Sequence, residues 1–369
     1  MDELDLLARA LPDAPPPSPE VVARARARLA AAPRPRRRPW MMWAPLATAA
    51  VVALVFSLVT SLAPIPEAAK PPKPNQELFD LADRIEKLPA RSGLYWREVV
   101  IDGSYLPLSG YTVLATSRLE TWQPRDAADP VLMWRWKPSA RPATAADERA
   151  WRAAGAPGQF KGFCDRSEPC EPMPINDEQH GCVYWQGVDP KGSYGNRSVA
   201  TFTMAELAAL PADEARLKER LRAYHKAQEG RGFDSFEEFL PTAATLLSAP
   251  IGPAQRAAII RILAALPTTK VVGTVTDPLG RKGLSVDLGT PGGSLVYSQR
   301  KELPVSYRWF LDPASGATLA RVSYAAHADK DLGVAKGEVA SFSANAPEYG
   351  WTQEQPVRPK GCKVSKVRN

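Results

Sequence analysis

Four cysteines are the residues of this sequence whose chemistry can be stated most directly: Cys164, Cys170, Cys182 and Cys362. None of them forms a Cys-x-x-Cys pair, and their spacings match no zinc signature, although His180 lies two residues before Cys182. An even number of cysteines favours two disulfides, which can connect in three ways. We therefore expect two disulfides of undetermined pairing, and no metal site.

Catalytic motifs are missing from the sequence. It contains no Gly-x-Ser-x-Gly elbow, no His-Glu-x-x-His zinc motif and no glycine-rich phosphate-binding loop. The three histidines, His180, His225 and His327, lie in different segments, and the carboxylates are scattered. The sequence therefore predicts a protein that is not an enzyme and that carries no cofactor.

Aromatic residues on two predicted strands are the candidate binding residues. Alternation with a period of two places Trp134 and Trp136 on one face of the first strand, and Tyr307 and Trp309 on one face of the second. Such stripes either line a ligand pocket or pack in the core of a sheet. We therefore name Trp134, Trp136, Tyr307 and Trp309 as candidate ligand-binding residues.

The elements that must position these residues are strands and amphipathic helices. A helix is predicted over 76–88, and three more are predicted in a helical block over 203–266. Three amphipathic helices in sequence must cover an apolar surface, and the sheet is the surface available, so the fold class expected is α+β. Strands are predicted at 94–101, 111–120 and 132–137. Six more, with short and regular spacing, are predicted to be antiparallel neighbours in a meander at 271–276, 284–288, 294–299, 305–311, 318–324 and 334–342.

The run Tyr307-Arg308-Trp309-Phe310-Leu311-Asp312-Pro313-Ala314-Ser315-Gly316 resembles the strand and Asp-Pro-x-Ser/Thr-Gly turn of LolA-like proteins, the class of lipoprotein carriers and sigma-factor-regulatory proteins. The order of elements is also similar to that class. The resemblance implies a curved antiparallel sheet, shaped as a half-open barrel, whose space accepts acyl chains or a lipid-modified partner.

The whole chain is also similar to a family of uncharacterised single-pass membrane proteins from actinobacteria. The likeness includes the Met1-Asp2-Glu3-Leu4 opening, an arginine-rich stretch before an apolar run, and Leu210-Pro211-Ala212-Asp213. This second resemblance implies no known activity.

An uncharged stretch covers residues 40–63, WMMWAPLATAAVVALVFSLVTSLA. A helix of this length rises about 36 Å, which is enough to cross a bilayer core. Arg34-Pro35-Arg36-Arg37-Arg38 stands just before it, and arginines flank membrane helices on the cytoplasmic side. We therefore predict a single-pass, signal-anchor protein of the cell membrane, with a cytoplasmic N-terminus and an extracytoplasmic C-terminal domain. A cleaved secretory signal and a buried helix of a soluble domain are the alternatives.

The predicted domain organisation follows from these segments. It has a cytoplasmic tail with short helices (1–39), a transmembrane helix (40–63), a proline-rich spacer (64–74), an outer domain (75–356) with a cysteine-containing insertion (138–200), and a basic tail (357–369). The formal net charge is +7 without a basic stripe interleaved with aromatics, so we expect no nucleic-acid partner. Residues 1–31 are either a docking segment for a cytoplasmic regulatory partner or a tail that only sets the orientation.

These observations favour a membrane-anchored extracytoplasmic binding or sensing protein. Its half-barrel would hold an apolar ligand, either a lipid or a lipidated protein. An anti-sigma-like transmembrane regulator that acts through its N-terminal tail, and a non-catalytic structural protein of the cell envelope, are the alternatives.

Overall fold

The computed structural model describes residues 75–108, 110–136, 138–161, 172–175, 182–187, 193–196, 200–227, 233–290, 293–298 and 301–364. The chain divides into two units, Met1–Lys70 and Pro71–Asn369, and every described residue belongs to the second unit. The predicted tail (1–39), span (40–63) and spacer (64–74) therefore lie outside the described residues.

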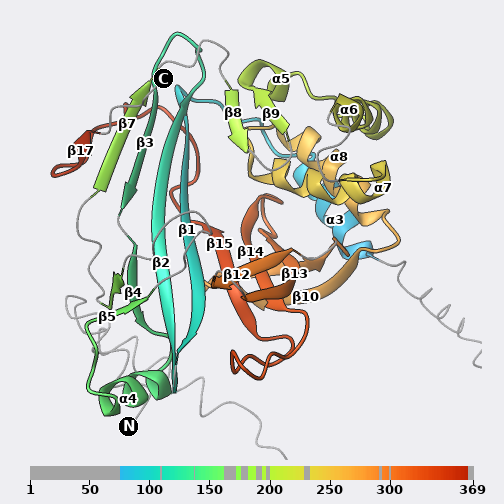
Figure 1. The fold of residues 1–369 in the computed structure, drawn as a ribbon. Helices are drawn as coiled ribbons and strands as arrows, with labels where there is room; N and C mark the ends of the chain where they lie inside the picture. Colours follow the sequence, from blue (N-terminus) through green and yellow to red (C-terminus); the bar gives the residue numbers. More distant parts are fainter. Residues whose placement is uncertain are drawn as a thin grey trace, which may run out of the picture. The chain divides into compact units, whose positions relative to one another are not determined.

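A large antiparallel sheet dominates the second unit (Figure 1). Its longest strands are β1 (Tyr95–Leu108) and β2 (Tyr111–Pro124), which pair along all 14 residues of each strand. Gly110, in the connection between them, has a φ of 93°, which a residue with a Cβ rarely adopts. The glycine therefore permits the tight reversal between two long strands.

The order of neighbours in this sheet is β10-β11-β13-β14-β15-β1-β2-β3-β7-β17. Strand β15 pairs directly with β1, so segments from the two ends of the described chain lie side by side. The pairing of β17 with β7 is parallel, and the other pairings of the sheet are antiparallel. The bounds are β3 (Val131–Trp136), β7 (Cys182–Gly187), β10 (Lys270–Thr276), β11 (Lys282–Asp287), β13 (Lys301–Leu311), β14 (Thr318–Ala325), β15 (Val339–Asn345) and β17 (Lys363–Val364).

Three short strands branch from this order, and two small hairpins stand apart from it. The branches are β4 (Ser139–Pro142) on β2, β12 (Ser294–Ser298) on β13 and β16 (Gly350–Thr352) on β1. The hairpins pair β5 (Gln159–Lys161) with β6 (Pro172–Pro174), and β8 (Ser193–Asn196) with β9 (Ala200–Thr203).

Most of the helices pack together in the largest hydrophobic core, which they share with apolar side chains of β11 and β13. In α3, the buried Leu78, Leu81, Ala82 and Ile85 recur at helical spacing and form one apolar face. The helices of this core are α3 (Gln76–Ile85), α5 (Met204–Ala208), α6 (Glu214–Ala227), α7 (Phe236–Phe239), the 3-10 helix η1 (Leu240–Ser248) and α8 (Pro253–Ala264).

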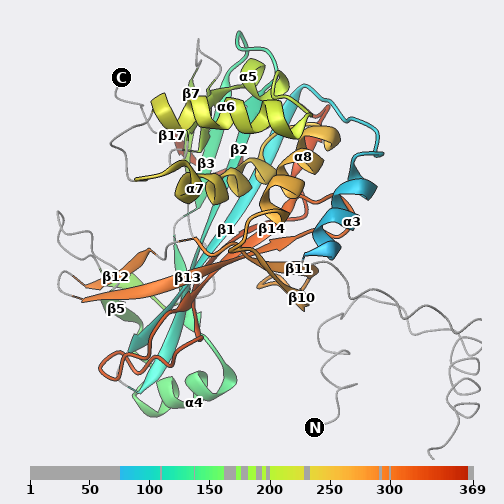
Figure 2. The same ribbon diagram turned by 90° about the vertical axis from the view of Figure 1, so that its right-hand side faces the viewer.

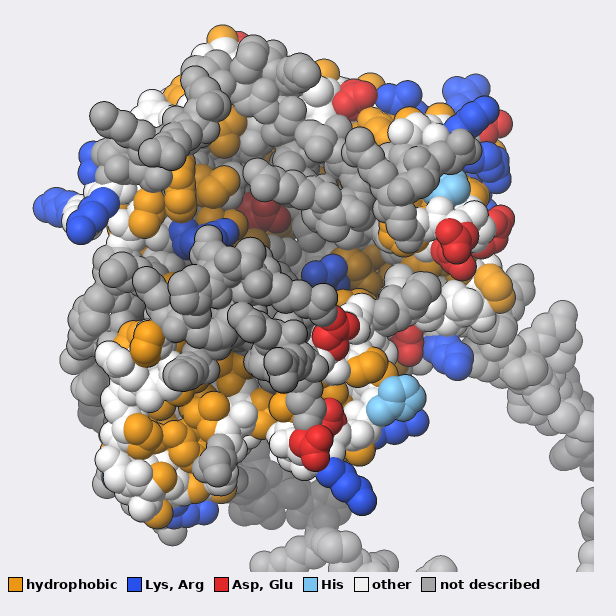
Figure 3. All heavy atoms as spheres, viewed as in Figure 1, with side chains coloured by type: hydrophobic (Ala, Val, Ile, Leu, Met, Phe, Trp, Pro, Cys, Tyr) orange, Lys and Arg blue, Asp and Glu red, His pale blue; other side chains and the backbone are white. Residues whose placement is uncertain are grey.

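One further helix, α4 (Ala145–Ala153), lies away from this core. In both ribbon views it is near the end of β1 and β2 opposite to α5 and α6 (Figure 1, Figure 2). It buries none of its residues, and Thr144 caps it by accepting a hydrogen bond from the Asp147 N–H. On the face drawn in Figure 3, charged side chains of both signs gather at the upper right, where α5 and α6 lie.

The predicted fold class is wrong. The structure has one large antiparallel sheet with few helices, in place of a half-open barrel covered by helices beside a membrane anchor. The physical reason is that the helices bury a small part of the sheet. Their core includes Leu284 and Val286 of β11 and Trp309 and Leu311 of β13, whereas β1 and β2 contribute no residue to it.

The predicted membrane topology is corrected as well. In the described part of the chain, no helix has the length and apolar character that a membrane crossing requires. The longest, α6, has 14 residues, whereas a span needs about 20. On this finding, the predictions of a transmembrane helix, of a single-pass signal-anchor protein and of the corresponding cell-membrane localisation are wrong. Residues 40–63, to which that helix was assigned, lie outside the described residues.

Candidate functional site

Trp134 and Trp136, predicted to bind a ligand, lie on β3 in a small aromatic core. Trp134 is buried beside Trp122 and Tyr184, and its indole N–H donates to Oε2 of Glu120 at 3.0 Å. Trp136 is partly buried against the same core, with the Arg118 guanidinium 5.1 Å from its ring centroid. These contacts of the two indoles are therefore with other side chains of the protein.

Tyr307 and Trp309, the other two candidates, lie on β13 in two different clusters. Trp309 is buried in the helical core, and Tyr307 packs at the edge of a small cluster around Val305. The space next to Trp309 measures about 10 Å³, which is about the room that one water needs and far less than an acyl chain needs. The four predicted residues thus occupy three separate clusters, and the structure does not bring them together in one site.

Cys182 and Cys362 form a disulfide, with their Cα atoms 4.6 Å apart and a sequence separation of 180. It joins β7 to the segment just before β17 and is buried in the aromatic core of Trp134. Cys164 and Cys170 lie outside the described residues, as does His180, so the second predicted disulfide stays a prediction. Among the described residues, no group of three or more His, Cys, Asp or Glu side chains could hold a metal ion.

A cavity of about 680 Å³ is the candidate functional site. Its volume lies within the range of about 300–1,000 Å³ that is typical of small-molecule sites. Six parts of the fold line it: the segment after α3, strand β1, the start of α8, the start of β11, the turn between β13 and β14, and the segment from the end of β15 to β16. Neither Trp134 nor Trp309 is among the described residues that line it.

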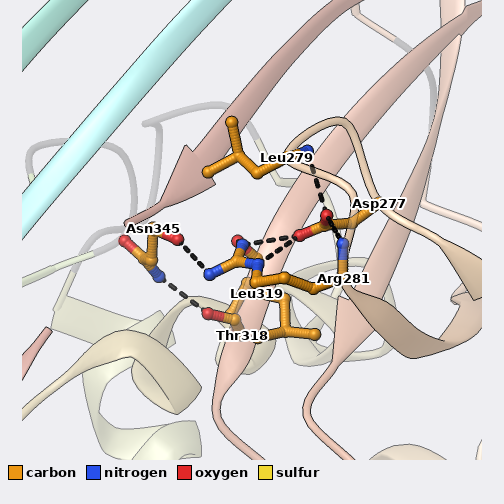
Figure 4. A network of polar contacts seen from close by, with 6 residues as sticks. All are labelled: Asp277, Leu279, Arg281, Thr318, Leu319 and Asn345. Atoms are coloured by element: carbon orange, nitrogen blue, oxygen red, sulfur yellow. Dashed lines mark hydrogen bonds and ion pairs between the residues drawn. The ribbon is translucent and has the colours of Figure 1, made fainter. Parts of the chain in front are cut away.

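Arg281 forms one wall of the cavity through a network of hydrogen bonds (Figure 4). Its guanidinium donates to the buried carboxylate of Asp277 at 2.5 and 2.8 Å and to the backbone carbonyls of Leu319 and Asn345. The Asn345 side chain in turn donates to the Thr318 carbonyl at 2.8 Å. The Arg281 charge is thus neutralised, and its donors bind the protein, so this arginine holds β11, β14 and β15 together.

The turn between β13 and β14 forms another wall. Oδ1 of Asp312 accepts the Ala314 N–H, Oδ2 accepts the Ser315 hydroxyl at 2.6 Å, and the Asp312 N–H donates to the Ala317 carbonyl. Gly316 has a φ of 65°, which suits glycine in this tight turn. The Asp-Pro-Ala-Ser-Gly motif therefore builds part of the cavity.

Aromatic residues form the third wall. Trp96 of β1 is paired in register with Trp351 of β16, and the two rings pack edge to face with their centroids 5.6 Å apart. The Tyr349 ring packs edge to face against the Trp96 ring, with the centroids 4.9 Å apart. Burial raises the pKa of the Tyr349 hydroxyl well above its ordinary value, although the nearby charge of Arg256 lowers it in part, so the phenol stays neutral. This wall offers aromatic surface to a ligand.

Arg256, in the first turns of α8, is the most unusual residue of the cavity. It is only 8% exposed, and the hydrogen bond that Nη2 donates to the Ile251 carbonyl is long, at 3.5 Å. Nε has no hydrogen-bond partner, and no carboxylate of the described chain pairs with this guanidinium. Two more buried polar atoms without a partner belong to residues that line the cavity, Nε1 of Trp96 and Oγ1 of Thr318.

Arg256 was missed by the sequence analysis, although a signal was present. It stands three and four residues before Ile259 and Ile260, on the apolar stripe that predicted this helix. A charged residue on such a stripe is buried with the apolar residues, and a buried charge needs a partner. No feature of the sequence marked Trp96 as a site residue, because aromatic residues on strands commonly pack in the core of a protein.

Comparison with protein-family models, with curated proteins and with solved structures finds no match for this chain. The two resemblances found in the sequence therefore stay predictions.

Proposed function

We propose that residues 71–369 form a binding module that holds a small, largely apolar molecule in the 680 Å³ cavity. The observation that carries the proposal is a cavity of ligand size with an aromatic wall, buried polar atoms without partners, and a wall held by the hydrogen bonds of Arg281. Its volume is sufficient for a small molecule, and its lining combines apolar and aromatic surface with a few polar groups, as is usual for ligand sites.

The binding role expected from the sequence is thus kept and assigned to different residues. The cavity is lined by Trp96, Ile251 and Trp351 instead of the predicted Trp134, Trp136, Tyr307 and Trp309. The space at Trp309 is too small for an acyl chain, so this proposal does not place a ligand there.

The proposal is tested with N-phenyl-1-naphthylamine, a neutral aromatic probe whose fluorescence rises in apolar sites. We expect the full-length chain to bind it saturably. Ala314→Trp, which adds an indole at the cavity wall, should weaken binding at least five-fold, because the indole takes up space that the probe needs.

Ala335→Trp is the matched control. Ala335, like Ala314, is exposed in a turn and donates its backbone N–H to a carboxylate, but it is not among the cavity residues. It should leave the affinity within two-fold of the original. Absence of saturable binding, or equal loss in the two variants, would overturn the proposal.

A further inference from the structure

We infer that the ligand of this cavity is an amphipathic acid, whose anionic group pairs with Arg256 while its apolar body lies against the aromatic wall. This inference rests on the proposed binding function and adds the chemical class of the ligand.

The first step is the charge of Arg256, which is buried without a matching anion. Burial lowers the pKa of its guanidinium, and Tyr349 and Asp312 act in the opposite direction, but an arginine stays protonated in any case. A buried cation without an ion pair is strongly unfavourable, and proteins normally pair it. Arg256 lines the cavity, so an anion bound there can supply the missing partner.

The second step compares Arg256 with the other charged residues of the cavity as a partner for an anionic group. The charged residues among the described lining are the cations Arg91, Arg256, Arg281 and Lys282, and one carboxylate, Asp312. Arg281 is already neutralised by Asp277. Asp312 acts on Arg256 through its field only, because its oxygens accept hydrogen bonds from its own turn and no ion pair joins the two side chains. The exposed Arg91 and Lys282 add positive potential at the cavity.

The third step is the position of Arg256 on its helix. α8 has 12 residues and begins at Pro253, which also lines the cavity. The N-terminus of a helix carries a partial positive charge, which favours an anion nearby. Its field therefore adds to that of the guanidinium at the same end of the cavity.

The fourth step concerns the body of the ligand. Trp96, Ile251, Tyr349 and Trp351 present apolar and aromatic surface to the same volume. A small inorganic anion would leave this surface uncovered, whereas a molecule with an acidic group and an apolar body covers both parts. An acid on an aliphatic or aromatic body is the chemical class that matches.

The test uses two probes that share one ring system. 8-Anilinonaphthalene-1-sulfonate carries an anionic sulfonate, and N-phenyl-1-naphthylamine lacks it. We expect Arg256→Gln in the full-length chain to weaken binding of the sulfonate at least ten-fold and to change binding of the neutral probe less than two-fold. Arg256→Lys, which keeps the charge, should lose less than Arg256→Gln.

Arg261→Gln is the control on the same helix. Arg261 pairs with Asp83 and Glu86 and is not among the cavity residues, so the affinities for both probes should stay within two-fold. If Arg256→Gln weakens both probes equally, or neither, the inference is wrong.

A second measurement needs no variant and so does not depend on the folding of Arg256→Gln. Decanoate and its neutral analogue decanamide are used to displace N-phenyl-1-naphthylamine from the unmodified chain. We expect decanoate to act at a concentration at least ten-fold lower. Equal concentrations would overturn the inference and leave the binding function intact, whereas failure of the neutral probe to bind at all would overturn the proposed function.

Discussion

Glu120 on β2 is a carboxylate buried between two tryptophans and an arginine. Its Oε1 accepts hydrogen bonds from the Trp122 indole at 2.9 Å and from Nε of Arg97 at 2.7 Å, and its Oε2 accepts the Trp134 indole at 3.0 Å. The residue is 3% exposed. One charged group thus satisfies two indole N–H groups that would otherwise be buried without an acceptor.

We predict that Glu120→Gln lowers the free energy of unfolding by about 3 kcal/mol. The amide removes the negative charge that faces Arg97, and it brings an N–H₂ donor against indole donors. Urea denaturation followed by tryptophan fluorescence measures the effect.

Glu148→Gln is the control for Glu120→Gln. Glu148 pairs with Arg152 on the surface of α4, and an exposed pair of this kind contributes about 0.5 kcal/mol or less. Equal effects of the two substitutions would show that the buried carboxylate has no special role.

Glu206 supplies a pH-dependent contribution. The Thr203 backbone N–H, which donates to its carboxylate at 2.9 Å, is the main cause that lowers the pKa of Glu206 below its ordinary value of 4.5. A carboxylate with a lowered folded-state pKa stabilises the fold above its unfolded-state pKa and loses that contribution as the pH falls through the folded-state value.

We therefore predict that Glu206→Gln is less stable than the unmodified chain at pH 7, and that the difference shrinks as the pH falls below 4.5. The urea midpoints of the two proteins, measured from pH 7 to pH 3, test this. A difference that stays constant over this range would contradict the role of the carboxylate charge.

Single residues show what the sequence could not predict. Along the strand predicted over 111–120, Glu120 falls in alternation with Thr112, Thr116 and Arg118, which predicts that it lies on the polar face. The burial arises because β3 pairs with β2 and sets Trp134 opposite Glu120, a neighbour 14 residues away in sequence. For Arg256, the sequence showed its place on an apolar stripe of the helix. It could not show the cavity beside it, because other cavity residues belong to strands far from α8 in sequence.

At the scale of elements, sequence periodicity located several segments but not their ends. The helix predicted over 76–88 is α3 (Gln76–Ile85), and the strand predicted to end at residue 101 continues as β1 to Leu108. That continuation contains Gly103 and Pro107, which are unusual inside strands. The continuation forms because β2 pairs with β1 along its full length. The Phe342 ring of β15 fills the space beside Gly103 that a side chain would otherwise occupy.

We predict that Gly103→Ala lowers the free energy of unfolding by about 2 kcal/mol. A Cβ at this position would lie 2.2 Å from Cε1 of Phe342, so the buried ring and the strand that carries it would have to move. Urea denaturation measures the loss.

Gly187→Ala is the control for Gly103→Ala. Gly187 also lies in a strand, β7, and a Cβ there would have no heavy atom within 4 Å. It should change stability by about 0.5 kcal/mol or less. A Gly103→Ala protein as stable as Gly187→Ala would contradict the close packing of β1 against β15.

At the scale of the whole molecule, the cavity depends on contacts that no local pattern contains. Its lining runs from Leu88 to Trp351, and each contributing segment is ordinary when taken alone. The Asp312–Gly316 turn was recognised as a motif, but its role as a wall appears only when α8 and β16 are in place. The regulatory role of residues 1–31, one of the two alternatives for that segment, stays untested, because the segment lies outside the described residues.

The most direct test of this account is a crystal structure of the full-length chain with 8-anilinonaphthalene-1-sulfonate bound. We predict that the rings of the probe lie against Trp96 and Trp351 and that its sulfonate faces the Arg256 guanidinium. A structure in which the probe binds elsewhere, while this cavity holds only solvent, would contradict the central claim.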